Sequence, residues 1–251
     1  MMTEPIETLL FDFGGTLDAD GVAWQPRFYA HYRAEGLEMA AADFAPVFHA
    51  ADDALVGALP READLEATVE RLAQNLEAEL ARGRRMPGVE RPRGRRIAAR
   101  FLGEAAAAFA RNRPHLEALA GRFRLAIVSN FYGNLEAVCR STGLASLFDV
   151  IVDSHRVGAA KPDPAIFRAA LAALSARPET SLMIGDSLAR DGEGARRSGI
   201  GFVWLTPRAE AGKLMAGQER VARLAELAEV LHGREGRKRE SQGRHHRRRR
   251  G

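Results

Sequence analysis

Two aspartates in this sequence stand where short apolar runs of residues come to an end. Asp12 falls within the run 8–13, and Asp186 closes the run 182–186, with Asp191 five residues further on. A carboxylate can attack phosphorus and form a covalent acyl phosphate. Paired carboxylates are also the hard oxygen ligands that Mg²⁺ takes together with water and substrate phosphate. These residues therefore predict phosphoryl chemistry, with Asp12 as the nucleophile and with Asp12 and Asp186 as metal ligands.

Three further polar residues follow other apolar runs and suit the same chemistry. Ser129 and the backbone of Asn130 can donate hydrogen bonds to phosphoryl oxygens, and Lys161 supplies a compact positive charge beside crowded anions. Asp191 is placed to orient a water on the metal or to orient Lys161, and we count it among the metal-site residues. Each piece alone is weak, since an aspartate after a strand is often a helix cap. The prediction rests on their combination in this order.

The elements that must position these residues are short buried strands. Five apolar runs are each followed by a turn and then by a helical pattern, which is typical of a parallel sheet covered on both faces. In such open α/β sheets, ligands bind beyond the carboxyl ends of the strands, so we expect the polar residues to gather at one edge. The runs cover residues 8–13, 125–129, 150–153, 182–186 and 202–205.

About a hundred residues between the first two runs carry no comparable strand signal. Segments 26–39, 43–57 and 97–110 have helical patterns, and between them a set of apolar residues falls on one helical stripe that we expect to be buried. The insertion is therefore predicted to be helical. The stripe consists of Leu65, Val69, Leu72, Leu76 and Leu80.

These patterns divide the chain into a sheet domain and an inserted helical module. We predict an α/β core at residues 1–18 and 109–233 and a helical cap at residues 19–108. The stretch 84–96 interrupts the cap with two prolines, two glycines and six arginines, which predicts a loop. Its arginines either hold an anionic substrate or are solvated. Trp24 either belongs to the core of the cap or lines the pocket.

Four short motifs contain the residues singled out above. They are Asp12-Phe13-Gly14-Gly15-Thr16-Leu17, Ser129-Asn130, Lys161-Pro162-Asp163-Pro164, and Gly185-Asp186-Ser187 followed by Asp191-Gly192-Glu193-Gly194-Ala195. Together they resemble the haloacid dehalogenase superfamily, in the subfamily with a helical cap inserted after the first motif. The resemblance implies a Rossmann-like core, a mobile cap, and Mg²⁺-dependent hydrolysis of a small phosphorylated metabolite through an aspartyl phosphate. It also implies that Gly15, Thr16 and Asn130 bind substrate and that the backbone carbonyl of Gly14 contacts the metal.

Position 14 departs from the pattern of that family. Family phosphatases carry a second aspartate two residues after the nucleophile, which protonates the leaving group and then activates water, whereas this chain has Gly14. Loss of a positioned acid and base lowers a rate by about 10² to 10⁴. Candidate substitutes are Asp18 and Asp20, just past the nucleophile, and then the cap residues His31 and His49. Each has an ordinary alternative role, as a helix cap, in packing or in solvent.

Other interpretations also accommodate Gly14. One is a catalytically impaired protein that binds phosphorylated ligands. A dehalogenase, in which the aspartate attacks carbon without a metal, is less favoured, because those relatives usually lack the Gly-Asp-Ser turn found at 185–187. Phosphonate cleavage through a Schiff base needs a cap lysine, which this sequence lacks. Its lysines are Lys161, Lys213 and Lys238.

Charge is distributed unevenly along the chain. The net charge is +4, but residues 234–251 hold nine Arg or Lys against two Glu, and residues 1–233 carry −3. This basic tail has no apolar side chains to bury, so we predict that it is disordered. Because no aromatic residues are interleaved for stacking on bases, we expect a solvated tail rather than one that binds nucleic acid.

The cysteine content and the hydropathy of the sequence indicate the cellular compartment to expect. The single cysteine, Cys139, permits no internal disulfide. No apolar run approaches the roughly 20 residues needed to cross a bilayer, and the first 30 residues lack a secretory pattern. We therefore expect a cytoplasmic protein without membrane contact, and the sequence gives no indication of its oligomeric state.

Overall fold

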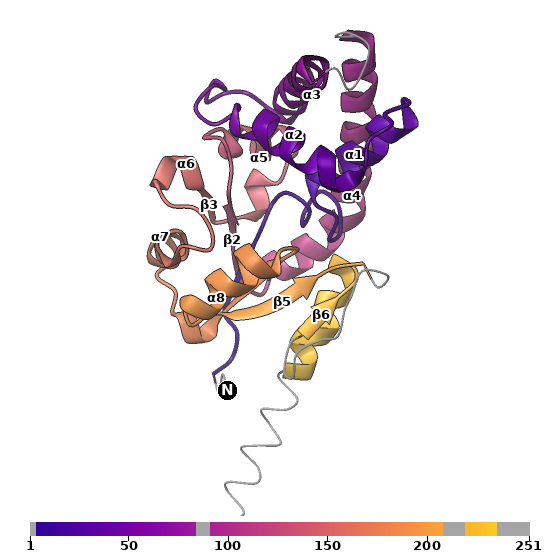
Figure 1. Cartoon of the computed structure of the whole chain (residues 1–251). Helices are drawn as coiled ribbons and strands as arrows, with labels where there is room; N and C mark the ends of the chain where they lie inside the picture. Colours follow the sequence, from indigo (N-terminus) through magenta and orange to yellow (C-terminus); the bar gives the residue numbers. More distant parts are fainter. Residues whose placement is uncertain (1–3, 84–90, 208–218, 235–251) are drawn as a thin grey trace, which may run out of the picture.

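The computed structural model describes residues 4–83, 91–207 and 219–234. At its centre is a six-stranded sheet in which all neighbouring strands run parallel, in the order β3-β2-β1-β4-β5-β6. The α/β class and the five predicted strands are confirmed. The strands are β1 (Thr8–Phe11), β2 (Arg124–Ser129), β3 (Val150–Asp153), β4 (Ser181–Gly185), β5 (Gly201–Leu205) and β6 (Glu219–Val221) (Figure 1).

Strand β1 lies in the middle of the sheet because it pairs with β2 on one side and β4 on the other. Phe11 is opposite both Ile127 and Ile184. Alternation along the strand sends Leu9 and Phe11 into one hydrophobic cluster and Leu10 into another. A strand buried on both sides in this way is largely apolar, as Leu9, Leu10 and Phe11 are.

Helices cover both faces of the sheet. The face that carries Leu10 packs against α7 and α8, whereas the face that carries Leu9 packs against α5, the end of α4 and the helical segment 227–234. These and the smaller elements are α5 (Leu135–Ser141), α6 (Ser154–Val157), α7 (Pro164–Leu174), α8 (Glu193–Arg197), the 3₁₀ turns Ala145–Leu147, Pro178–Thr180 and Leu224–Glu226, and the π-helical turn Leu188–Gly192.

Four helices fill the chain between β1 and β2, as the sequence predicts. They are α1 (Trp24–Ala34), α2 (Ala41–Asp53), α3 (Leu65–Arg82) and α4 (Arg91–Ala120). The predicted leucine-rich stripe of α3 is buried. Aromatic rings hold the helices together, and Phe28 of α1 stacks on Phe101 of α4 with ring centroids 4.7 Å apart.

The predicted loop at 84–96 is wrong for its second half. Residues 84–90 lie outside the described part of the chain, but residues 91–96 form the first turns of α4. Arg93 donates two hydrogen bonds, of 2.9 and 2.6 Å, to the carboxylate of Glu77 on α3, and both side chains are buried. A Cβ on Gly94 would lie 3.3 Å from Cγ of Glu77, so glycine permits this close approach. A buried ion pair therefore offsets the low helix propensity of Gly94, while Pro92 falls in the first turn of α4, where proline is tolerated.

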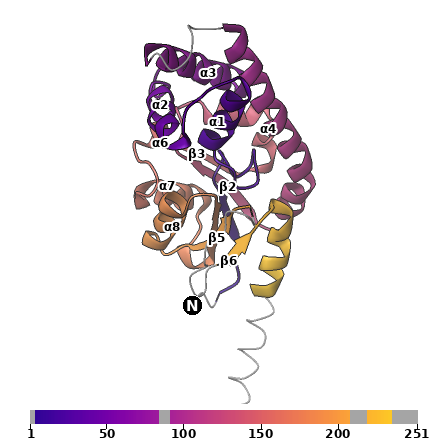
Figure 2. The ribbon, with the colours of Figure 1, turned by 45° about the vertical axis from the view of Figure 1, so that its right-hand side comes forward.

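Figure 2 shows α4 as one long helix that runs from the other inserted helices down to the side of the sheet. Its first half packs in the insertion through Phe101, and its second half joins the core cluster of Leu9 through Leu116. The predicted boundary at residue 108 falls inside this helix. No loop separates the two parts there, and the division into core and cap stays a prediction.

The C-terminal part holds one strand that the sequence did not reveal. Strand β6 pairs with β5 at the edge of the sheet, with Leu205 opposite Val221. Two of its three residues are charged, so it carries no apolar run. Arg234, counted in the predicted tail, donates a 2.6 Å hydrogen bond to Glu219. The rest of that tail, 235–251, lies outside the described residues. Among the described helices, none is long and apolar enough to cross a membrane.

Candidate active site

The ends of three neighbouring strands bring the predicted residues to one edge of the sheet. Asp12 directly follows β1, and its N–H donates to the carbonyl of Ile184 in β4 at 2.9 Å. Ser129 is the last residue of β2, and Asp186 directly follows β4. Lys161 joins them from the loop between α6 and α7. The convergence expected at the carboxyl ends of parallel strands is therefore present.

Lys161 links two of the carboxylates. Its Nζ lies 2.6 Å from Oδ1 of Asp12 and 2.7 Å from Oδ1 of Asp191, and all three side chains are buried. Burial alone lowers the pKa of this lysine, but the two carboxylates outweigh it, and the pKa of Lys161 is raised. Ser129 Oγ donates a third contact, to Oδ1 of Asp12 at 2.8 Å. The ammonium group is thus charged and fixed beside Asp12.

Asn130 holds the backbone of Lys161. Its side-chain oxygen accepts a 2.7 Å hydrogen bond from the N–H of Lys161, and its Nδ2 donates to the carbonyl of Lys161 at 3.1 Å. The peptide bond between Lys161 and Pro162 is cis. The side chain of Asn130 therefore positions the lysine, a role that the sequence did not indicate, while its predicted backbone contact with substrate stays a prediction.

Three carboxylates form a compact cluster that fits a divalent cation. Asp12, Asp186 and Asp191 each offer an oxygen, and these oxygens lie within 4.8 Å of one another. Among the described residues, no group hydrogen-bonds the buried Oδ1 of Asp186. Burial, and then the charges of Asp12 and Asp191, raise the pKa of Asp186. An all-oxygen donor set with an unsatisfied buried carboxylate is what Mg²⁺ binds in proteins, so the residues suit this ion.

Two glycines allow the carboxylates to approach the backbone. Gly15 has a φ of +86°, and a Cβ there would lie 2.5 Å from Oδ2 of Asp186. A Cβ on Gly185 would overlap the carboxylate of Asp191, whose Oδ2 also accepts a 3.0 Å hydrogen bond from the N–H of Ser187. Both glycines are therefore required by close approach, and at Gly15 by the backbone as well. Thr16, the next residue, is buried, and no described residue partners its hydroxyl. The substrate contacts predicted for Gly15 and Thr16 stay predictions.

Asp18, the first candidate for a replacement acid, is engaged elsewhere. It is fully buried and accepts hydrogen bonds from the N–H of Gly15 at 2.6 Å, Nε1 of Trp24 at 2.8 Å and Nη1 of Arg27 at 2.7 Å. Burial raises the pKa of this carboxyl, against the opposing effect of Arg27. These three donors give Asp18 a structural role, in which it ties the loop after β1 to helix α1.

Asp20, the second candidate, faces away toward α4 and the C-terminal segment. Its carboxylate accepts hydrogen bonds from Arg111 at 2.6 and 3.1 Å, from Asn112 at 3.1 Å and from the N–H of Leu224 at 3.3 Å. Of the two histidines, His31 lies 3.3 Å from Glu104. None of these contacts reaches Asp12, and the role of Asp18 or Asp20 as a replacement acid stays a prediction.

At Gly14 the neighbouring side chain is the indole of Trp24. A Cβ on Gly14 would lie 3.2 Å from Nε1 of Trp24. Trp24 packs on Phe101 and also borders the loop after β1, and the choice between cap core and substrate pocket stays open. The contact between the Gly14 carbonyl and the metal stays a prediction.

Two groups near the site escaped the sequence-based reasoning. Tyr132, which follows β2, donates a 2.5 Å hydrogen bond to Asp52 of α2 and so links the insertion to the sheet. Arg190 lies in the π-helical turn between Asp186 and Asp191. Desolvation lowers its pKa, but the charges of nearby carboxylates, first Asp12 and then Asp186, outweigh that effect, so the pKa is raised. The sequence offers one signal for Arg190, namely that it is a cation placed between two predicted metal ligands.

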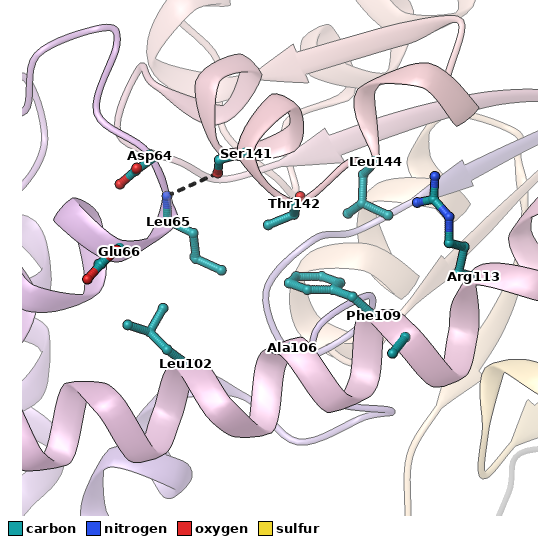
Figure 3. Close-up of a pocket in the computed structure, with 11 residues that line it drawn as sticks. Asp64, Leu65, Glu66, Leu102, Ala106, Phe109, Arg113, Ser141, Thr142 and Leu144 are labelled. Atoms are coloured by element: carbon teal, nitrogen blue, oxygen red, sulfur yellow. Dashed lines mark hydrogen bonds between the residues drawn. The ribbon is translucent and has the colours of Figure 1, made fainter.

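Two cavities among the described residues are lined by residues other than those of the carboxylate cluster. One, of about 660 Å³, is bordered by the start of α3, the middle of α4 and the end of α5, and Figure 3 shows Leu102 and Phe109 of α4 facing Leu65 and Thr142 across it. A second, of about 330 Å³, includes Asp18 among its lining residues. Neither contains a residue of the cluster described above.

Comparison with known proteins gives consistent results. Residues 6–199 match the family of haloacid dehalogenase-like hydrolases. Over 77 residues, the chain is 43% identical to the haloacid dehalogenase-like hydrolase domain-containing protein 3 of Bos taurus, a match that covers 31% of each chain. Over 63 residues, it is 44% identical to the phosphoserine phosphatase of Thermus thermophilus, covering 25% of each. The matched segments thus span less than a third of the length of either relative.

Solved structures share the fold. The chain resembles the HAD-hydrolase YfnB of Bacillus subtilis, in a structure bound to magnesium, with a TM-score of 0.55 and 21% identity. The likeness covers 91% of this chain and 99% of YfnB. At this level of identity it supports the fold alone.

Proposed function

The chain belongs to the haloacid dehalogenase-like hydrolases, and from that premise we propose that it hydrolyses phosphate monoesters of small metabolites with Mg²⁺, through a covalent phosphate on Asp12. The observation that carries the proposal is the buried arrangement of Asp12, Lys161 and the two further aspartates at the end of the sheet. The phosphatase named among its relatives is consistent with it.

Each group has a defined task in this reaction. Ser129 and Lys161 both contact Oδ1 of Asp12, which fixes the carboxylate for attack on phosphorus. The charge of Lys161 offsets the negative charge that accumulates when a phosphate enters beside two aspartates. A bound Mg²⁺, held by Asp12, Asp186 and Asp191, would neutralise the phosphoryl oxygens.

Protonation of the leaving group and activation of water are the steps of the catalytic cycle that we expect to be slow. Gly14 supplies no acid for the leaving group and no base for water, and the nearby Asp18 and Asp20 are committed to other contacts. We therefore expect turnover below that of a relative with both aspartates, by about 10² to 10⁴.

Phosphate release from a panel of phosphomonoesters and acyl phosphates, measured with and without Mg²⁺, tests the proposal. Asp12→Asn should abolish release, whereas the same change at the exposed Asp43 of α2 should leave it intact. Equal activity in Asp12→Asn would remove Asp12 from the mechanism. Binding of phosphorylated compounds without release would indicate an impaired enzyme, and halide release from 2-haloacids without Mg²⁺ would indicate a dehalogenase.

A further inference from the structure

Trp24 lies tightly against the position that a Cβ on residue 14 would take. A Cβ built on Gly14 would lie 3.2, 3.5 and 3.6 Å from Nε1, Cδ1 and Cε2 of the indole. Gly14 is not among the glycines with a left-handed backbone. The neighbouring ring, and not the backbone, therefore limits what this position can carry.

The indole is held in place from three sides. Its Nε1 donates a 2.8 Å hydrogen bond to Asp18, and its ring packs edge-on against Phe101 of α4, at 5.1 Å between centroids, and Phe131, which lies beyond β2, at 6.1 Å. Trp24 is only 8% exposed. Turning the ring away would remove a donor from the buried Asp18 and open a gap between aromatic side chains, so the obstruction is a fixed part of the fold.

Charge also disfavours an acid at position 14. Asp18 accepts from the same indole nitrogen that a Cβ on Gly14 would touch, so a new carboxylate would enter beside an existing buried one. Arg27 is the cation paired with Asp18, and it already contacts Glu104 as well. Two carboxylates sharing one cation in a buried region repel each other.

We infer that Trp24 stands in the place of the missing acid, and that the site is consequently confined to phosphate substrates whose leaving group departs without a proton. The inference rests on the proposed function and narrows its substrate class. Aryl phosphates and acyl phosphates fall within the class, because phenolates and carboxylates are stable anions. Alkyl phosphates, whose alkoxides need a proton, fall outside it.

Each step of this reaction can proceed without a protein acid, because the leaving oxygen keeps the electron pair of the broken bond. An oxygen of Asp12 forms a bond to phosphorus while the bond from phosphorus to the leaving oxygen breaks, and that oxygen keeps the electron pair and leaves as an anion. Water then attacks the aspartyl phosphate, which restores the carboxylate, releases inorganic phosphate and loses a proton to solvent. Protonation of the leaving group, where it occurs, follows in bulk water.

A series of phosphate esters with leaving groups of increasing pKa, from 4-nitrophenyl through phenyl to alkyl phosphates, measures the claim directly. We expect kcat/KM of the natural protein to fall steeply along the series. A shallow dependence, with alkyl phosphates hydrolysed nearly as well as aryl ones, would show that a proton donor is present and would overturn the inference while leaving the proposed function intact.

Two substitutions and their combination test the part played by Trp24. Gly14→Asp alone should give no gain on alkyl phosphates, because the indole remains. Gly14→Asp together with Trp24→Ala should gain roughly 10²-fold or more on alkyl phosphates and flatten the series. An equal gain from Gly14→Asp alone would show that Trp24 is no obstruction. Trp24→Leu replaces Trp24→Ala if the smaller residue prevents folding.

Thermal unfolding supplies a readout that needs no activity. Gly14→Asp should lower Tm in the natural background and lower it less beside Trp24→Ala, since the two changes share one space. Gly103→Asp is the matched control, because nothing lies within 4 Å of a Cβ at that exposed position of α4. Additive effects on Tm would refute the obstruction. If neither the natural protein nor any variant releases phosphate from any ester, the proposed function has failed, and the proposed substrate class fails with it. The Tm comparison still decides whether Trp24 obstructs a side chain at position 14.

Discussion

The two sides of the loop after β1 differ in how their carboxylates are satisfied. On the sheet side, Asp12, Asp186 and Asp191 lie close together, Lys161 pairs with the first and the last of them, and Asp186 keeps a buried oxygen without a partner among the described residues. On the cap side, Asp18 and Asp20 are each engaged by several donors. The sheet side is arranged to receive a ligand, and the cap side is arranged to hold the chain together. Residue type alone does not distinguish these roles.

Removal of the cation on the sheet side should have the largest effect. Lys161→Met leaves the buried carboxylates of Asp12 and Asp191 without their ammonium partner, and we expect the free energy of unfolding to fall by about 3–5 kcal/mol, with loss of hydrolysis. Urea unfolding measures the loss, and Mg²⁺ should restore more stability to the variant than to the natural protein. Arg177→Met, which breaks an exposed pair with Glu4, is the control. An equal fall in the free energy of unfolding in Lys161→Met and Arg177→Met would show that the buried ion pair is worth no more than the exposed one.

The gain in stability that Mg²⁺ produces should depend on the carboxylates of the sheet side and not on Asp18. Mg²⁺ at about 100 times its dissociation constant should stabilise the natural protein by about 2.7 kcal/mol. Asp186→Asn should abolish most of this gain because it removes the unsatisfied carboxylate, whereas Asp18→Asn should retain it. Thermal unfolding across a Mg²⁺ titration gives both values. A full Mg²⁺ response in Asp186→Asn would contradict the assignment of the metal site.

On the cap side, Asp18→Asn should cost stability rather than chemistry. Loss of the charge opposite Arg27 should lower the free energy of unfolding by about 1.5–3 kcal/mol. Hydrolysis of 4-nitrophenyl phosphate, corrected for the folded fraction, should stay within about tenfold, less than the 10² to 10⁴ expected for a positioned acid. A larger loss of rate in fully folded protein would restore Asp18 as the replacement acid.

The smallest effect is expected at Asp20. Its partner Arg111 is 49% exposed, so Asp20→Asn should lower the free energy of unfolding by less than about 1 kcal/mol. Phosphate release should be unchanged, as judged by initial rates beside the Asp43→Asn control. A selective loss on alkyl phosphates, with normal stability, would instead identify Asp20 as a proton donor.

The sheet side of the site was predictable because parallel strands impose it. Once Asp12, Ser129 and Asp186 follow buried runs, the topology alone brings them to one edge, and Lys161 follows the next strand along. The contacts of the cap side could not be predicted, because the topology of the sheet does not impose them. These contacts join side chains far apart along the chain, such as Asp20 and Arg111, and nothing local to either residue encodes the pairing.

Backbone structure failed to follow local preference at two places. The start of α4 is helical despite Gly94, because Arg93 reaches Glu77 on the preceding helix. Strand β6 forms despite its charged residues, because the edge of β5 offers a parallel ladder to pair with. In both cases a partner from another segment supplies the free energy that the local sequence lacks.

Helix α4 carries a mechanical consequence. Its 30 residues extend about 45 Å at 1.5 Å per residue, from the inserted helices to the sheet, so both parts of the molecule share one rigid rod. An opening of the insertion cannot then pivot freely at residue 108. It must bend that rod, and Pro114, which lacks a backbone N–H, is the point of least bending resistance. We therefore expect the bending stiffness of this single helix, rather than the freedom of a loop, to limit how far the inserted helices can open.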